Sequence, residues 1–403
     1  MFLEQFWLRD FRSYHEAHLQ PATDGLTVVT GDNGAGKTNL LEAVAYLATM
    51  RSFRGASTEA MVRDGAPRAV VRGEGHGGGR RLLIEGELNP AGRDRVQVNR
   101  QPLRRSADLL EGLRVTVFTP DDLTLVKGGP QGRRDLLDDL LESLHPRHRQ
   151  ARGEVERVLR QRAALLRSAG GNPRPPADVV TTLDVWDAKL AAAGEALVGA
   201  REGLAAALSQ PAAAAYRELA SAAGGRGAVA LRYLRSWQGS LASALAAGRG
   251  DDLRRGVNTV GPHRDELVLE VGGMPARTHA SQGEQRSLAL ALRLAGHAVV
   301  SARVGSPPVL LLDDVFSELD ARRSAALVAL LPAGQALLTT AGGVPAGTHP
   351  EQVVRVAGGT IVAGGGRPGG AGSGGGAGEG AVAGGPAGGL RGPAATGCDR
   401  LER

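Results

Sequence analysis

The most constraining feature of this sequence is a glycine-rich loop between a strand pattern and a helix pattern. Residues 26–30 are β-branched and apolar, and residues 39–48 carry apolar side chains at helical spacing. The loop between them matches G-x-x-x-x-G-K-[ST] and consists of Gly31, Asp32, Asn33, Gly34, Ala35, Gly36, Lys37 and Thr38. A strand, this loop and a helix, in that order, predict a phosphate-binding loop.

Each part of the loop predicts a contact with a nucleotide. Glycines let the backbone curve around a phosphate, and the following helix adds the positive end of its dipole. We expect Lys37 to reach the terminal phosphates and Thr38 to hold Mg²⁺. The alternative is a glycine-rich turn without a ligand. The scarcity of lysine argues against it, because Lys37, Lys127 and Lys189 are the only three lysines among 403 residues.

Composition excludes several classes of protein. The hydrophobic content of 42% is sufficient for a globular core, and no apolar run approaches the roughly 18 residues of a membrane span. The single cysteine, Cys398, excludes a disulfide framework and a cysteine-based metal site. Residues 1–9 resemble a strand rather than a signal peptide. We therefore expect a cytoplasmic protein. The net charge of +6 permits nucleic-acid binding without establishing it.

The order of the patterns predicts an α/β fold with a split ATPase core. Short strand patterns at 68–73, 80–88, 94–99 and 113–118 predict an antiparallel sheet that flanks the nucleotide site. Helix patterns cover 133–168, 183–220 and 238–255, and strands then alternate with helices up to 340, which predicts a mainly parallel sheet. The expected domains are a first core half (1–120), an inserted helical lobe (121–256), a second core half (257–362) and a disordered Gly/Ala-rich tail (363–403).

The second half of the site is predicted where an apolar strand ends in two carboxylates. Residues 308–312 form an unbroken apolar run before Asp313 and Asp314, which is the Walker B pattern. Asp313 is placed to hold Mg²⁺ opposite Thr38, and Asp314 to orient or deprotonate the attacking water. The alternative is a strand that happens to end in an acidic turn.

A further motif precedes a long helix pattern that begins near residue 284. The motif consists of Ser281, Gln282, Gly283, Glu284 and Gln285. A serine followed three residues later by glutamate is a capping box, which is the structural interpretation. The functional interpretation uses the same geometry, because a hydroxyl and a backbone N–H at a helix N-terminus bind anions. Both interpretations can hold together.

The order of phosphate loop, Ser281–Gln285, Walker B and residues 317–320 resembles the ATP-binding-cassette superfamily. More narrowly, the chain resembles the RecF family of bacterial recombination mediators. Matching stretches span residues 1–340 and lie at 11–14, 31–43, 51–54, 117–123, 125–128, 261–265, 281–290 and 311–320. The stretches Gly-Pro-His-Arg-Asp at 261–265 and Asp-Asp-Val-Phe-Ser-Glu-Leu-Asp at 313–320 are the most specific.

The resemblance implies a DNA-repair ATPase that acts as a switch in replication-fork maintenance and the SOS response. ATP and Mg²⁺ would join two protomers head to tail. Asn39 would bind the nucleotide together with the loop, and residues 281–285 of the other protomer, through Ser281 and Gly283, would close each site. The dimer would bind duplex DNA near single-strand gaps and help to load the recombinase, with RecR and RecO as partners. Hydrolysis would release the DNA.

Departures from the cassette pattern predict slow hydrolysis. No glutamine loop is evident, and Leu338, Thr339 and Thr340 lie where cassette transporters carry a histidine near the γ-phosphate. These departures disfavour one alternative, a transporter ATPase. The other alternative is a chromosome-organising ATPase head, and the short helical region disfavours it because no long coiled coil would fit.

Aromatic residues make up only 3% of the chain, so contacts with DNA are expected to depend on arginine–phosphate pairs. The candidate contacts are Arg51, Arg54, Arg63, Arg104, Arg105, Arg133 and Arg134. Each of these side chains has the alternative of being ordinary solvated surface. For His263 we expect a structural or phosphate-side role, because Arg264 beside it argues against a metal site.

Overall fold

The computed structural model describes residues 1–103, 109, 112–171, 175–221 and 227–362. Residues Met1–Arg367 form one compact unit, to which all the strands and helices below belong. The predicted tail at 363–403 lies outside the described residues, as do Arg104 and Arg105.

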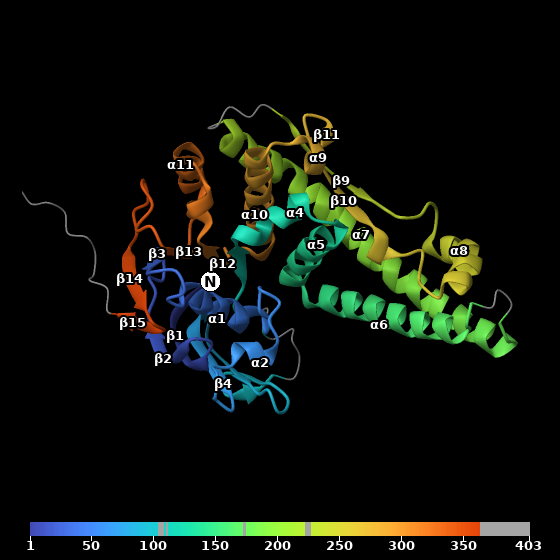
Figure 1. Ribbon diagram of the computed structural model, residues 1–403, viewed down its shortest axis with the longest axis horizontal. Helices are drawn as coiled ribbons and strands as arrows, with labels where there is room; N and C mark the ends of the chain where they lie inside the picture. Colours follow the sequence, from blue (N-terminus) through green and yellow to red (C-terminus); the bar gives the residue numbers. More distant parts are fainter. Residues whose placement is uncertain (104–108, 110–111, 172–174, 222–226, 363–403) are drawn as a thin grey trace, which may run out of the picture. The chain divides into compact units, whose positions relative to one another are not determined.

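A six-stranded, mainly parallel sheet forms the centre of the ATPase core (Figure 1). Strands β3, β8, β12, β13 and β14 run parallel, and β15 is antiparallel to β14 at one edge. All residues of β12 and β13 are buried, which explains the apolar run at 309–312 in β12. The spatial order is β15 (Thr360–Val362), β14 (Gln352–Ala357), β3 (Gly25–Thr30), β13 (Gln335–Thr340), β12 (Val309–Asp313) and β8 (Val115–Phe118).

A second, antiparallel sheet covers the other side of helix α1 (Lys37–Thr49). One hydrophobic cluster contains α1 residues together with residues of both sheets, so α1 is packed between them. Gly73 permits this packing, because a β-carbon there would lie 2.7 Å from the Leu47 Cδ1 atom. The strands in spatial order are β2 (Tyr14–Leu19), β1 (Phe2–Phe11), β4 (Ala69–Gly77), β5 (Arg80–Leu88), β6 (Arg95–Val98) and β7 (Gln101–Pro102).

The prediction for residues 113–118 was wrong in one respect. These residues do contain a strand, β8, but it pairs in parallel with β12 of the central sheet instead of joining the antiparallel sheet. A four-residue pattern indicates a strand without indicating its partner, because partner choice depends on contacts with distant segments.

The helical lobe contains α5 (Pro130–Leu144), α6 (Pro146–Ser168), α7 (Ala177–Ser221) and α8 (Leu241–Arg255). The predicted helix at 133–168 is two helices, because Pro146 disfavours helical geometry at His145, which is extended with φ −157° and ψ 134°. Helix α7 is continuous over 45 residues, about 68 Å at 1.5 Å per residue. The short helices α2 (Thr58–Met61) and α4 (Leu123–Lys127) and the 3₁₀ turn η1 (Pro120–Asp122) complete the segments before the lobe.

A small three-stranded sheet joins the lobe to the second core half. Its strands are β9 (Val229–Leu234), β10 (Glu266–Val271) and β11 (Met274–Pro275), and β9 pairs with β10 over six residues. This pairing crosses the boundary predicted at residue 256. The 3₁₀ turn η2 (Pro262–Arg264) precedes β10, and helix α9 (Ala276–His279) follows β11.

Helix α10 (Gln282–Val304) connects the lobe to the core. Leu288 and Leu292 of α10 share a cluster with Leu204 and Leu208 of α7 and with residues of the central sheet. By length and composition α10 could cross a membrane, but 67% of its apolar window is buried inside the protein, as in the core helix of a soluble protein. The 3₁₀ turn η3 (Val315–Glu318) and helix α11 (Ala321–Leu330) follow β12.

Candidate nucleotide-binding site

The glycine-rich loop connects β3 to α1 as the sequence predicted. Gly31, Gly34 and Gly36 have φ values of 157°, 81° and 111°, so the last two occupy the region that favours glycine. A β-carbon at Gly36 would lie 2.8 Å from the Ser13 Oγ atom. Tyr14, buried against the loop, donates from its hydroxyl to the Gly36 carbonyl at 3.0 Å. The stretch at 11–14 therefore packs against the phosphate-binding loop and stabilises its shape.

Lys37 lies along the inside of the loop. Its side chain is buried, and its Nζ atom donates to the carbonyl oxygens of Gly31 and Asp32, both at 2.8 Å. An ammonium group has three donors. Two therefore hold the loop in shape, and the third remains for a phosphate.

Thr38 and Asp313 meet although 275 residues separate them. The Thr38 hydroxyl donates to the Asp313 carboxylate at 2.9 Å. Burial raises the pKa of Asp313, and hydrogen bonds from Thr339 and Thr38 oppose that rise. Among the described residues no group of three or more His, Cys, Asp and Glu side chains gathers as a metal site. Two oxygen ligands suit Mg²⁺, which takes its other ligands from water and phosphates.

Thr339 is a site residue whose role the sequence did not predict. It is fully buried, and its hydroxyl donates to Asp313 at 2.7 Å while accepting from the Asp314 backbone N–H at 3.0 Å. Asp314 has a left-handed backbone, with φ 47° and ψ 30°. Such a conformation is uncommon for aspartate and is maintained only where the surroundings determine it. Thr339 thus orients both carboxylate residues at once.

Glu42 on α1 is a second residue that the sequence did not single out. It is fully buried, and Arg12 donates to its two carboxylate oxygens at 2.8 and 2.7 Å. The Ser52 hydroxyl also donates to Glu42, and Arg54 lies 3.8 Å away. This cluster explains two of the matching stretches, because 11–14 and 51–54 are both fastened to α1 through one carboxylate.

The motif at 281–285 forms the first turn of α10. Ser281 accepts from the Glu284 N–H at 3.3 Å and Glu284 accepts from the Ser281 N–H at 2.8 Å, so the predicted capping box is present. Ser281 and Gln282 are exposed, whereas Gln285 is buried and donates to two carbonyl oxygens of α9. Through these two hydrogen bonds Gln285 anchors the motif to α9.

The comparison with known proteins now decides the family. A model of the RecF/RecN/SMC N-terminal domain matches residues 2–340. The DNA replication and repair protein RecF of Streptomyces avermitilis is 44% identical over 364 residues, covering 85% of this chain and 95% of that protein. This chain belongs to the RecF family. The RecF protein of Kineococcus radiotolerans is also 44% identical, over 379 residues, with 87% and 95% covered.

Solved structures agree with the family assignment. A structure of the recombination mediator RecF with ATP, from the RecFOR pathway, superimposes with a TM-score of 0.80 at 25% identity. It covers 90% of this chain and 97% of that one. An SMC head bound to a winged-helix domain of ScpA, with a TM-score of 0.54 and 16% identity, shares the fold alone. The chain is thus a DNA replication and repair protein with the fold of RecF and SMC ATPase heads.

The Gly-Pro-His-Arg-Asp stretch of this RecF-family chain is structural. Asp265 is fully buried and accepts from the Tyr233 hydroxyl at 2.7 Å and from the Ser236 N–H at 2.8 Å. Arg201 of α7 donates to the Pro262 carbonyl at 2.9 Å. Burial lowers the pKa of His263, whose Nε2 atom pairs with a backbone carbonyl. The stretch fastens β9 and β10 to the helical lobe.

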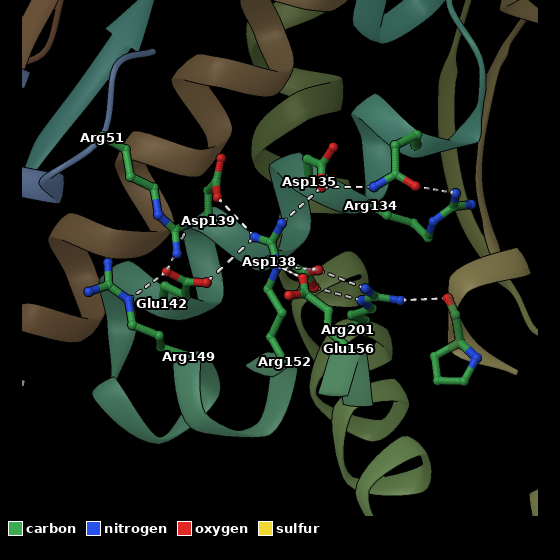
Figure 2. Close-up of polar contacts among 12 residues, drawn as sticks. Arg51, Arg134, Asp135, Asp138, Asp139, Glu142, Arg149, Arg152, Glu156 and Arg201 are labelled. Carbon is green, nitrogen blue, oxygen red and sulfur yellow. Dashed lines mark hydrogen bonds and ion pairs between the residues drawn. The ribbon is translucent and has the colours of Figure 1, made fainter. Parts of the chain in front are cut away.

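Two of the predicted DNA contacts in this RecF-family chain were wrong. Arg133 is buried and forms a two-pronged ion pair with Glu266, with both distances 2.8 Å. Arg134 is also buried, and it donates to the Asp265 carbonyl at 2.6 Å. Figure 2 shows Arg134 beside the ion pairs of the lobe. An arginine pattern on a helix does not reveal which members turn inward.

Three of the predicted arginines remain at the surface. The side chains of Arg51, Arg54 and Arg63 are 55%, 47% and 39% exposed. Arg51 lies 3.9 Å from Glu142 on α5, a contact visible in Figure 2, and Arg63 lies 2.8 Å from Asp10. Because the three arginine side chains are this exposed, a phosphate can approach their guanidinium groups.

Proposed function

We propose that this protein is an ATP-driven switch that dimerises head to tail on duplex DNA near single-strand gaps and helps to load the recombinase. The observation that carries the proposal is the separation of two half-sites. Thr38, Asp313 and the loop form one half-site, whereas no hydrogen bond within the described ranges joins residues 281–285 to residues 31–39. The exposed capping turn therefore needs a second copy of the chain to meet a nucleotide.

The chemistry of the proposed site follows from its own residues. ATP is the expected nucleotide, as in the related RecF structures. Thr38 and Asp313 would hold Mg²⁺, which neutralises charge on the β- and γ-phosphates. Lys37 contributes its free donor to the same phosphates, and Asp314 orients or deprotonates the attacking water. From the partner, the Ser281 hydroxyl and the Gly283 N–H meet the γ-phosphate at the positive end of α10.

Slow hydrolysis is consistent with a switch. Residues 338–340 lie where cassette transporters use a histidine, and the Thr339 hydroxyl is engaged with the Asp313 carboxylate and the Asp314 backbone N–H. A threonine carries no charge to stabilise the developing negative charge of the transition state. Binding of ATP would therefore form the dimer, and slow cleavage of ATP would release the dimer from DNA.

DNA binding and partners complete the proposal. The net charge of +6 and the exposed arginines at 51, 54 and 63 support contact with DNA phosphates. The proposed location of the protein is the cytoplasm. RecR and RecO are the proposed partners, supported by the RecFOR pathway named for the related structures.

Sedimentation tests the assembly. ATP, but not ADP, should convert monomer to dimer, because only the γ-phosphate reaches Ser281 of the partner. Ser281→Arg should bind ATP and remain monomeric, whereas Gln210→Arg, a substitution at an exposed position of α7, should dimerise like the parent. If Ser281→Arg dimerises normally with ATP, the capping turn is only a helix cap and the proposed dimer is wrong.

Measuring binding to duplex, single-stranded and gapped DNA across a salt series tests the proposed DNA binding. With ATP, affinity for duplex should fall steeply with salt, because arginine–phosphate pairing releases counterions. Equal affinity with and without ATP, or a flat salt response, would contradict the proposal.

A further inference from the structure

Two arginines connect the capping turn of α10 to the segment after Walker B. Arg323 of α11 donates from Nε to the Ser287 hydroxyl at 3.3 Å and from Nη1 to Asp320 at 2.5 Å. Its guanidinium lies directly against Gly283, where a β-carbon would come within 2.8 Å of its Cζ atom. Gly283 therefore has a structural reason besides anion binding. Any side chain at this position would displace Arg323.

Arg286 makes the second connection. It lies one helical turn along α10 and donates from Nη1 to the Glu318 carbonyl at 3.0 Å. Its Nη2 atom lies 3.1 Å from the Glu318 carboxylate. The first turn of α10 and residues 317–320 are thus held together at two points by side chains that are 18% and 34% exposed.

The segment held by these arginines continues directly to Asp314. Ser317 donates from its hydroxyl to the Asp314 carbonyl at 2.8 Å, and its N–H approaches the same oxygen at 3.3 Å. Asp314 is the residue with the left-handed backbone that Thr339 holds from the other side. A path from Gly283 to Asp314 therefore runs through Arg323 and its ion pair with Asp320, along the chain from residue 320 to residue 317, and through the Ser317 hydrogen bond.

We infer that Arg323, assisted by Arg286, is a positioning residue that couples the two ATP sites of the dimer. The inference rests on the proposed head-to-tail dimer, in which the partner's ATP meets Ser281 and Gly283. When the partner's ATP binds this turn, it holds the Arg323 side chain in place. Arg323 then holds residues 317–320, and these residues hold Asp314 in the chain's own ATP site. Each ATP thereby prepares the carboxylate that cleaves the other ATP. Ion pairs at this exposure contribute little to stability, so the role of Arg323 is geometric.

The test uses mixed dimers to distinguish an effect of Arg323 on its own chain's ATP site from an effect on the partner's ATP site. By the proposed mechanism, Asp314→Asn protomers bind ATP and cleave it about 10²–10⁴-fold more slowly, so one chain of a mixed dimer accounts for the hydrolysis in a single turnover. In the first arrangement Arg323→Gln is placed in the chain with intact Asp314, and the partner carries Asp314→Asn in excess. In the second, Arg323→Gln is placed in the Asp314→Asn chain, and this chain is in excess over its parent partner. Arg322→Gln, at the exposed neighbouring position, is the matched control in both arrangements.

Single-turnover hydrolysis should fall about fivefold or more in the first arrangement, the lower end of typical coupling between sites, and should match the parent in the second. The second arrangement also shows that Arg323→Gln folds and dimerises. A loss only in the second arrangement would mean that Arg323 merely shapes the turn for the partner's ATP. Loss in both or in neither would also overturn the inference. If the parent stays monomeric with ATP in sedimentation, the proposed dimer itself fails, and that result is distinct from all of these.

Discussion

Thr339→Val removes the hydroxyl that orients both carboxylate residues while keeping the shape of the side chain. The hydroxyl donates to Asp313 at 2.7 Å, and it is fully buried, so no water replaces it. A hydrogen bond to a charged group contributes about 1.5–3 kcal/mol, which corresponds to about tenfold to a hundredfold in affinity. We expect Mg²⁺-dependent ATP binding to weaken by about this factor at acidic pH.

The effect of Thr339→Val on Mg²⁺ affinity should depend on pH in a definite direction. Burial already raises the pKa of Asp313, and the Thr339 hydrogen bond is the largest opposing influence, so its loss raises this pKa further. Mg²⁺ binds the ionised carboxylate, so affinity declines as pH falls through the pKa. The deficit of Thr339→Val should therefore be small at alkaline pH and should grow as pH falls.

Titration of Mg²⁺ at fixed fluorescent ATP, between pH 5 and pH 9, measures this effect. Thr340→Val is the matched control, because Thr340 is also buried but its hydroxyl accepts from the Gly342 N–H instead of meeting Asp313. The reasoning fails if Thr339→Val and Thr340→Val show the same Mg²⁺ affinity at every pH, or if the deficit grows toward alkaline pH.

Three other substitutions have definite expected outcomes. Lys37→Met should weaken ATP binding by an order of magnitude or more, measured by nucleotide titration, because a charge-assisted hydrogen bond to phosphate is lost. Asp314→Asn should slow single-turnover hydrolysis by about 10²–10⁴-fold and prolong the dimer on DNA; lost ATP binding would reverse the roles of Asp313 and Asp314. Burial lowers the pKa of His297 to about 4, so below pH 6.5 the unfolded chain binds a proton that the folded chain refuses. His297 should lower stability by about 1.4 kcal/mol per pH unit between pH 6.5 and 4, and His297→Gln should remove that contribution from the pH dependence measured by urea denaturation.

The sequence by itself determined the local features that depend on neighbouring residues. The loop at 31–38 needs glycines at fixed positions, and the capping box needs a serine three residues before a glutamate, so both are readable from spacing. The apolar run before Asp313 likewise predicted a buried strand, which is β12. The family resemblance added the order of these features along the chain.

Only the tertiary structure decided which distant side chains meet. Thr339 reaches Asp313 because β12 and β13 are parallel neighbours, a pairing that no local pattern states. Arg133 and Arg134 turn inward because residues of the 261–266 segment, more than 120 positions away, supply their partners. Arg323 lies against Gly283 for the same reason. Spacing along the chain specifies backbone geometry, whereas the partner of a charged side chain depends on packing between elements that are remote in sequence.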